Sequence, residues 1–134
     1  MTVIYRILTA AEWQESQAKG ALSPNALDQR SGFMHFSSEA EVLETVARYF
    51  AAKSDPVALR ISADDLGDDL KWEPVESRGG VAFPHLYADS LPLERVHAVL
   101  PLQVQPDGTY RWGEARSLSL PNDSTRQDRE QGAE

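Results

Sequence analysis

The chain of 134 residues contains no cysteine, which excludes disulfide bonds, thiolate zinc sites and a thiol nucleophile. It also lacks any run of about 18 apolar residues, so no segment is typical of a transmembrane helix. The N-terminus has no basic region followed by a long apolar stretch, and a signal peptide is not expected. These absences favour a cytoplasmic protein without a membrane partner.

Positive charge is scarce as well. Thirteen Lys and Arg residues stand against 21 Asp and Glu residues, which gives a net charge of −8 at pH 7. A surface of this sign disfavours broad binding to nucleic acids or anionic membranes. It still permits a small anionic ligand, because a few basic groups or a helix N-terminus can hold one phosphate.

The patterns that are present predict an α+β fold. Thr9 and Glu12 form a capping box that predicts a helix over 10–19, and Ser38 with Glu41 predicts a second helix. Residues 21–31 are expected to form a loop. Apolar and β-branched runs predict strands over 3–8, 32–37, 57–62, 71–75, 83–87, 96–105 and 109–112. Because only the early part alternates helix and strand, α+β is favoured over a doubly wound parallel sheet.

The domain organisation follows from the same patterns. Residues 1–113 are expected to form a single domain, since this length can bury a core of its own. Residues 114–134 are polar, with little hydrophobic content, and are expected to be a disordered tail.

A repeated pattern surrounds two of the three histidines. Phe33, His35 and Ser37 alternate along one predicted strand, and Phe83, His85 and Tyr87 alternate along another. Side chains at this spacing share one face of a strand. An imidazole beside a hydroxyl can donate and accept hydrogen bonds, and the imidazole can change its charge near neutral pH. The pattern therefore predicts a shared polar site, with two separate structural histidines as the alternative.

Three more polar residues are candidates for this site. Arg6 interrupts an apolar strand and either meets an anion or extends outward to solvent. Glu73 follows Trp72 and is either an acid–base group with a raised pKa or a solvated strand residue. Ser37 either lines the pocket or caps the following helix.

No metal site is assigned from the sequence. The acidic run Asp64–Asp69 lacks the ligand spacing of an EF-hand, and Gly79-Gly80 lacks the Lys-Ser/Thr ending of a phosphate loop. His97 is expected at the surface. A two-histidine, one-carboxylate site of His35, His85 and Glu73 would suit a metal-dependent hydrolase, and this stays a third hypothesis.

Five short motifs in this order resemble a bacterial family known as domain of unknown function 952. The resemblance covers about residues 3–112 and rests on Val-Ile-Tyr-Arg-Ile at 3–7, Glu-Trp at 12–13, Ser-Gly-Phe-Met-His-Phe-Ser at 31–37, Lys-Trp-Glu-Pro at 71–74 and Phe-Pro-His-Leu-Tyr at 83–87. The chain departs from the family pattern at Arg6, where His is usual, and at Ala88, where Gly is common.

This family is similar in fold to the ADP-ribosyltransferase superfamily. The resemblance implies a split β-sandwich of two small antiparallel sheets with flanking helices, and NAD as a substrate in the cleft between the sheets. It implies that Arg6 contacts ribose or phosphate, that His35 and Ser37 flank the nicotinamide ribose, and that Glu73 is the late carboxylate. His85 and Tyr87 belong to the family's own motif without a settled role.

The predicted function is therefore binding of a nucleotide-like ligand with transfer or hydrolysis of ADP-ribose. His35, Glu73 and His85 are the predicted catalytic residues, and Arg6, Ser37 and Tyr87 are predicted to bind the ligand. No cofactor is assigned beyond NAD as a substrate. The alternative is a module that binds the same kind of ligand without turnover.

Overall fold

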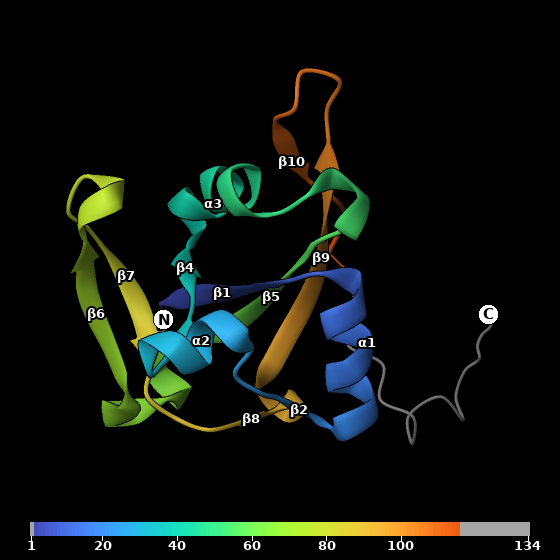
Figure 1. Ribbon diagram of the computed structural model, residues 1–134. Helices are drawn as coiled ribbons and strands as arrows, with labels where there is room; N and C mark the ends of the chain where they lie inside the picture. Colours follow the sequence, from blue (N-terminus) through green and yellow to red (C-terminus); the bar gives the residue numbers. More distant parts are fainter. Residues whose placement is uncertain (1, 116–134) are drawn as a thin grey trace.

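The computed structural model describes residues 2–115, and these residues form an α+β fold, as predicted (Figure 1). The helices of this part are α1 (Ala10–Lys19), α2 (Ala26–Ser31) and α3 (Val42–Tyr49). None of its helices combines the length and apolar character that a membrane span requires. The prediction of a disordered tail lies outside the described residues from residue 116 onward.

The largest sheet has five antiparallel strands in the order β10-β9-β5-β1-β4. Its strands are β1 (Val3–Leu8), β4 (Ser37–Ser38), β5 (Val57–Ser62), β9 (Val96–Val104) and β10 (Tyr110–Trp112). The predicted strands over 3–8 and 57–62 are confirmed. The strands predicted over 96–105 and 109–112 form the antiparallel pair of β9 and β10, with a turn at Asp107-Gly108 in which the glycine is left-handed, φ 89°.

Two smaller sheets complete the architecture. The three-stranded sheet has the order β3-β7-β6 and contains β3 (Met34–His35), β6 (Leu70–Val75) and β7 (Val81–Leu86). The two-stranded sheet pairs β2 (Ala21–Leu22) with β8 (Leu91–Pro92). Only Phe36 separates β3 from β4, so the chain passes from the three-stranded to the five-stranded sheet at this residue.

The hydrophobic core lies on both faces of β1. Ile4 and Leu8 point into one cluster, and Tyr5 and Ile7 point into the other, as the alternation of a strand requires. Helix α3 covers the second cluster with Val42 and Val46 at helical spacing, and both side chains are fully buried. Burial of each such aliphatic side chain contributes about 1.5–3 kcal/mol before entropy is counted. On the first face Arg6 stands between Ile4 and Leu8, so this buried row contains one charge.

The number of sheets differs from the expected two. A third sheet forms because Gly20, with φ 81°, ends α1 in the left-handed conformation and the chain continues at once as β2 beside β8. Strand β6 runs through Pro74 to Val75, in agreement with the strand predicted over 71–75. An edge strand tolerates proline because one side of it needs no hydrogen-bond donor, and β6 lies at the edge of its sheet.

Two predictions for the segment 21–41 are wrong. Residues 26–31 form helix α2 instead of a loop, because Asn25 and Asp28 make a reciprocal capping box. Ser38 does not cap α3 through its side chain. A 3₁₀ turn over Glu39–Glu41 intervenes, and α3 begins at Val42.

Candidate functional site

The two histidines of the repeated pattern lie directly opposite each other. In the antiparallel pairing of β3 with β7, His35 is the partner of His85. Their ring centroids are 5.6 Å apart with an angle of 66° between the planes. Side chains of directly paired residues on one face are close neighbours, so this register brings both imidazoles to one place.

His35 is held by a buried carboxylate. Its Nδ1 lies 2.6 Å from Oδ1 of Asp28, so Nδ1 carries the proton and donates it to the carboxylate. The backbone N–H of His35 also donates to Asp28, at 3.2 Å. With Nδ1 engaged, the Nε2 atom of His35 is left for other partners, and the side chain keeps 33% exposure.

Asp28 also neutralises Arg6. The guanidinium of Arg6 lies 2.5 Å from Oδ2 of Asp28, and the two side chains are only 2% and 1% exposed. Arg6 donates as well to the backbone carbonyl of His35, at 2.9 Å. The anion that a buried Arg6 requires is therefore a carboxylate of the chain itself. Burial raises the pKa of Asp28, but hydrogen bonds from His35 and Arg6 and the charge of Arg6 outweigh burial and hold it well below its usual value.

His85 has a carboxylate of its own. Its Nδ1 lies 2.7 Å from Oε1 of Glu73, and the phenol of Tyr87 donates to the same oxygen at 2.8 Å. These hydrogen bonds, from His85 first and then Tyr87, lower the pKa of Glu73, which is the opposite of the raised pKa that the sequence suggested. The bond to Glu73 raises the pKa of Tyr87, because ionisation would place two anions side by side.

Phe33 joins the two histidines into one aromatic cluster. Its ring stacks on His85 with centroids 4.0 Å apart and an angle of 21°, and it lies 4.7 Å from the ring of His35. The shared face predicted for Phe33 and His35 accounts for the second contact. This packing limits how far either imidazole can rotate.

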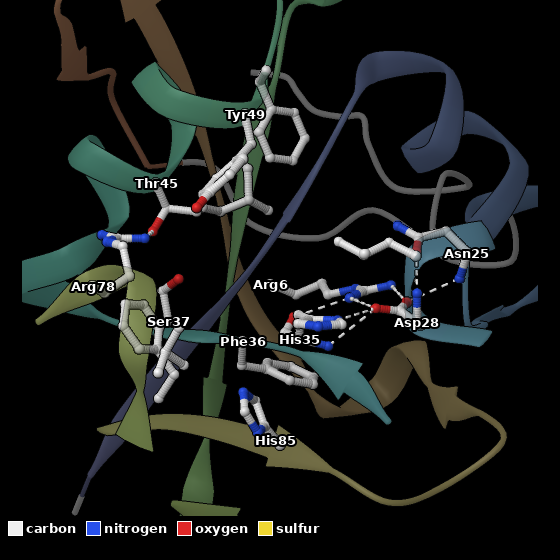
Figure 2. Close-up of a pocket in the computed structure, with 15 residues that line it drawn as sticks. Arg6, Asn25, Asp28, His35, Phe36, Ser37, Thr45, Tyr49, Arg78 and His85 are labelled. Atoms are coloured by element: carbon white, nitrogen blue, oxygen red, sulfur yellow. Dashed lines mark hydrogen bonds and ion pairs between the residues drawn. The ribbon is translucent and has the colours of Figure 1, made fainter. Parts of the chain in front are cut away.

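A cavity of about 320 Å³ opens beside these rings, between the five-stranded and the three-stranded sheet (Figure 2). The close-up shows α3 on one side of it, with Thr45 and Tyr49, and Asn25 and Asp28 of the α2 segment on the other. Four of the predicted site residues contribute to its wall, namely Arg6, His35, Ser37 and His85. Much of the remaining wall is apolar, with Ile7, Leu27, Phe36, Phe50, Val75 and Phe83.

Glu73 and Tyr87 are not part of this wall. Glu73 reaches the cavity only through His85, and Tyr87 lines a neighbouring polar hollow of about 450 Å³, together with Gln29 and Asp89. Asp28 borders both spaces. Four of the six predicted residues thus border the cavity, whereas Glu73 contacts His85 and Tyr87 contacts Glu73.

A second buried arginine was missed by the sequence analysis. The side chain of Arg78 is 4% exposed, and the residue follows β6 in a short 3₁₀ turn. It pairs with Glu41 at 2.9 Å, donates to Thr45 at 2.8 Å, and lies 4.7 Å above the ring of Phe83. No short sequence pattern around Arg78 predicts its burial, because its partners lie in α3 and in the 3₁₀ turn that precedes α3.

Asp28 was missed as well, although a signal exists. The spacing Asn25-x-x-Asp28 is a capping box in which Asp replaces the usual Glu, and the structure shows both of its hydrogen bonds at 2.9 Å. The pattern would have placed Asp28 in a short helix. It would not have linked the carboxylate to Arg6 and His35.

The geometry does not favour the metal hypothesis. Within residues 2–115 no three His, Asp or Glu side chains are arranged to hold a metal ion. Glu73 contacts Nδ1 of His85, so these two groups bind each other instead of converging on one point. His97 lies apart, with 44% exposure and Asp65 3.7 Å away, at the surface as expected.

Comparison with known proteins identifies the family and gives no activity. The crystal structure of protein CC0527 from Caulobacter crescentus is similar, with a TM-score of 0.74, 39% identity, and coverage of 82% of this chain and 94% of that one. Its solution NMR structure gives a TM-score of 0.70 at 40% identity, with coverage of 81% and 91%. No functionally curated protein matches. The family model described as a protein of unknown function, DUF952, matches residues 7–99. The chain therefore belongs to the DUF952 family.

Proposed function

We propose that the cavity binds a nucleotide-like ligand and that His35 and His85 act on it as acid–base groups. One observation carries the proposal: both imidazoles donate Nδ1–H to a carboxylate and stand 5.6 Å apart at the same cavity. A carboxylate at Nδ1 fixes the tautomer in which Nε2 is the free base, and it stabilises the imidazolium that forms when Nε2 takes a proton.

NAD is the ligand we place first, with transfer or hydrolysis of ADP-ribose as the reaction. The support is the motif resemblance to families of ADP-ribosyltransferase-like fold, together with the position of the cavity. It lies where β1 and β4 of one sheet meet β3 and β7 of another, which parallels a cleft between two sheets. Its volume lies at the lower end of the roughly 300–1,000 Å³ range of small-molecule sites.

The reaction assigns a distinct task to each residue. The bond between nicotinamide and C1′ of the ribose breaks, and its electron pair leaves with the ring nitrogen of neutral nicotinamide. Water or an acceptor hydroxyl attacks C1′, and its proton passes to Nε2 of His85. Glu73 orients His85 and balances the new charge. His35 donates or accepts a hydrogen bond at the ribose, and the Ser37 hydroxyl binds the ligand.

Arg6 takes a positioning task in this proposal. Because its charge is already matched by Asp28, it holds Asp28 and the His35 carbonyl instead of a phosphate. Tyr87 likewise acts through Glu73, whose oxygens it contacts at 2.8 and 3.1 Å.

Calorimetric titration with NAD, followed by a nicotinamide-release assay, tests the proposal. We expect heat of binding at millimolar NAD and release of nicotinamide by the wild type. Turnover should be lost in His85→Ala and reduced in Glu73→Gln, while the surface variant His97→Ala retains it. Absence of both binding and release would refute the proposal.

A non-catalytic binding module is the second candidate. It is favoured by the position of Glu73, which leaves the cavity wall without a free carboxylate beside the ribose. In that case NAD binds equally to the wild type and to Glu73→Gln, and neither protein releases nicotinamide.

A further inference from the structure

The cavity contains two buried arginines, and both are already neutralised. Arg6 is paired with Asp28 at 2.5 Å, and Arg78 is paired with Glu41 at 2.9 Å and approaches Glu44 at 3.7 Å. A phosphate entering the cavity would therefore find no uncompensated cation among these pairs. It would also come close to the carboxylate of Asp28, which lines the cavity and repels it.

The remaining wall favours apolar contact. Phe36, Val75 and Phe83 line the interior, while Leu27 and Tyr49 are about half exposed, with 49% and 60% of their surface accessible. Figure 2 shows Tyr49 on α3 across the cavity from the α2 segment that bears Asn25 and Asp28. A wall that combines aromatic rings with a few fixed polar groups suits a flat ring with one or two hydrogen-bonding atoms.

The cost of desolvation points the same way. Moving a charged group from water into a partly enclosed apolar space is unfavourable unless an opposite charge is available there. Here the available charges are used within the chain, and the chain as a whole is strongly acidic. An uncharged ring avoids both penalties.

We infer that this cavity selects an aromatic or heteroaromatic ring without negative charge and excludes anionic groups, phosphate included. The inference rests on the proposed function only in taking the cavity as the ligand site. For NAD it means that the nicotinamide ring, which carries no negative charge, enters the cavity, while the phosphates stay outside in solvent.

Nicotinamide and nicotinate provide a matched test, because they share one shape and differ by a single negative charge at neutral pH. We expect calorimetry at pH 7.5 to show nicotinamide binding at least about tenfold more tightly than nicotinate, which corresponds to about 1.4 kcal/mol. Inorganic phosphate should not compete. Amide shifts in ¹H–¹⁵N spectra should locate the nicotinamide contacts at residues of the cavity wall.

Two rim variants and a control sharpen the test. Leu27→Ser and Tyr49→Ser change half-exposed side chains, so both should fold and should weaken nicotinamide binding several-fold. Val104→Ser changes a residue of 46% exposure that is not part of the cavity wall, and it should leave binding unchanged.

The inference is overturned if nicotinate or phosphate binds in the cavity as tightly as nicotinamide, or if nicotinamide does not bind there at all. It stands if nicotinamide is preferred while NAD is neither bound nor turned over, and in that case only the proposed function fails. Turnover of NAD without any preference for the neutral ring would retain the function and reject this inference.

Discussion

Replacing Asp28 with Asn should be among the most damaging single changes in the protein. The carboxylate accepts hydrogen bonds from the Arg6 guanidinium, from the ring and backbone of His35, and from the backbone N–H of Asn25. An amide has one acceptor oxygen, and its NH₂ group would face donors that it cannot satisfy. The substitution also leaves the guanidinium of Arg6, 2% exposed, without a counter-charge.

The magnitude follows from the burial of this pair. Removing one partner of a buried ion pair costs about 3–5 kcal/mol, because the other charge stays desolvated and unpaired. With an m-value of about 2 kcal/mol per M, a loss of about 4 kcal/mol moves the urea midpoint down by about 2 M. Urea denaturation followed by circular dichroism measures the midpoint and the m-value together.

The control is Glu15→Gln, which removes an exposed partner of Lys19 at 3.7 Å. Exposed pairs contribute about 0–1 kcal/mol, so this variant should unfold close to the wild type. In a double-mutant cycle with Arg6→Met, we expect a coupling of about 2–3 kcal/mol. A loss below about 1 kcal/mol in Asp28→Asn would refute the claim that Asp28 compensates Arg6.

Three further predictions follow from the same contacts. The pKa of Asp28 is lower in the folded chain than its usual value of 3.8, so the stability that its carboxylate contributes is present above pH 3.8 and is lost as the pH falls further. The free energy of unfolding should therefore fall less steeply with decreasing pH in Asp28→Asn than in the wild type. The pKa of Tyr87 is raised by Glu73 and should fall toward its usual value in Glu73→Gln, as measured by ultraviolet titration of each protein against its Tyr87→Phe counterpart. Asn25→Ala removes one half of the α2 capping box and should destabilise the fold by about 0.5–2 kcal/mol in thermal unfolding, with a similar loss for Thr9→Ala at α1; a loss at neither position would contradict the capping assignment.

Local patterns were sufficient for the elements whose signals lie within a few residues. The capping box of Thr9 with Glu12 and the glycine at position 20 define α1, and alternation defines β1 and β5. The aromatic-x-His pattern also pointed to the pair of imidazoles, because both strands expose alternate residues on one face. The register that places His35 opposite His85 could not be read from either strand alone.

The carboxylates of the site show the limit of such reasoning. Glu73 was expected beside the ligand, but the pairing of β6 with β7 places it diagonally across from His85 and turns it toward Nδ1. Asp28 forms its ion pair with Arg6, and Arg78 forms its ion pair with Glu41, so both residues depend on partners in other elements of the fold. Such contacts depend on tertiary packing, and no spacing along the chain encodes them.

The central claim is that His35 and His85 share one cavity with Nδ1 bound to a carboxylate and Nε2 free. A long-range ¹H–¹⁵N spectrum of the histidine rings at pH 8 tests this most directly, with exposed His97 as an internal reference. We expect both His35 and His85 to show the Nδ1–H tautomer, and their ring protons to give a mutual nuclear Overhauser effect. An Nε2–H tautomer at either residue, or no contact between the rings, would contradict the account.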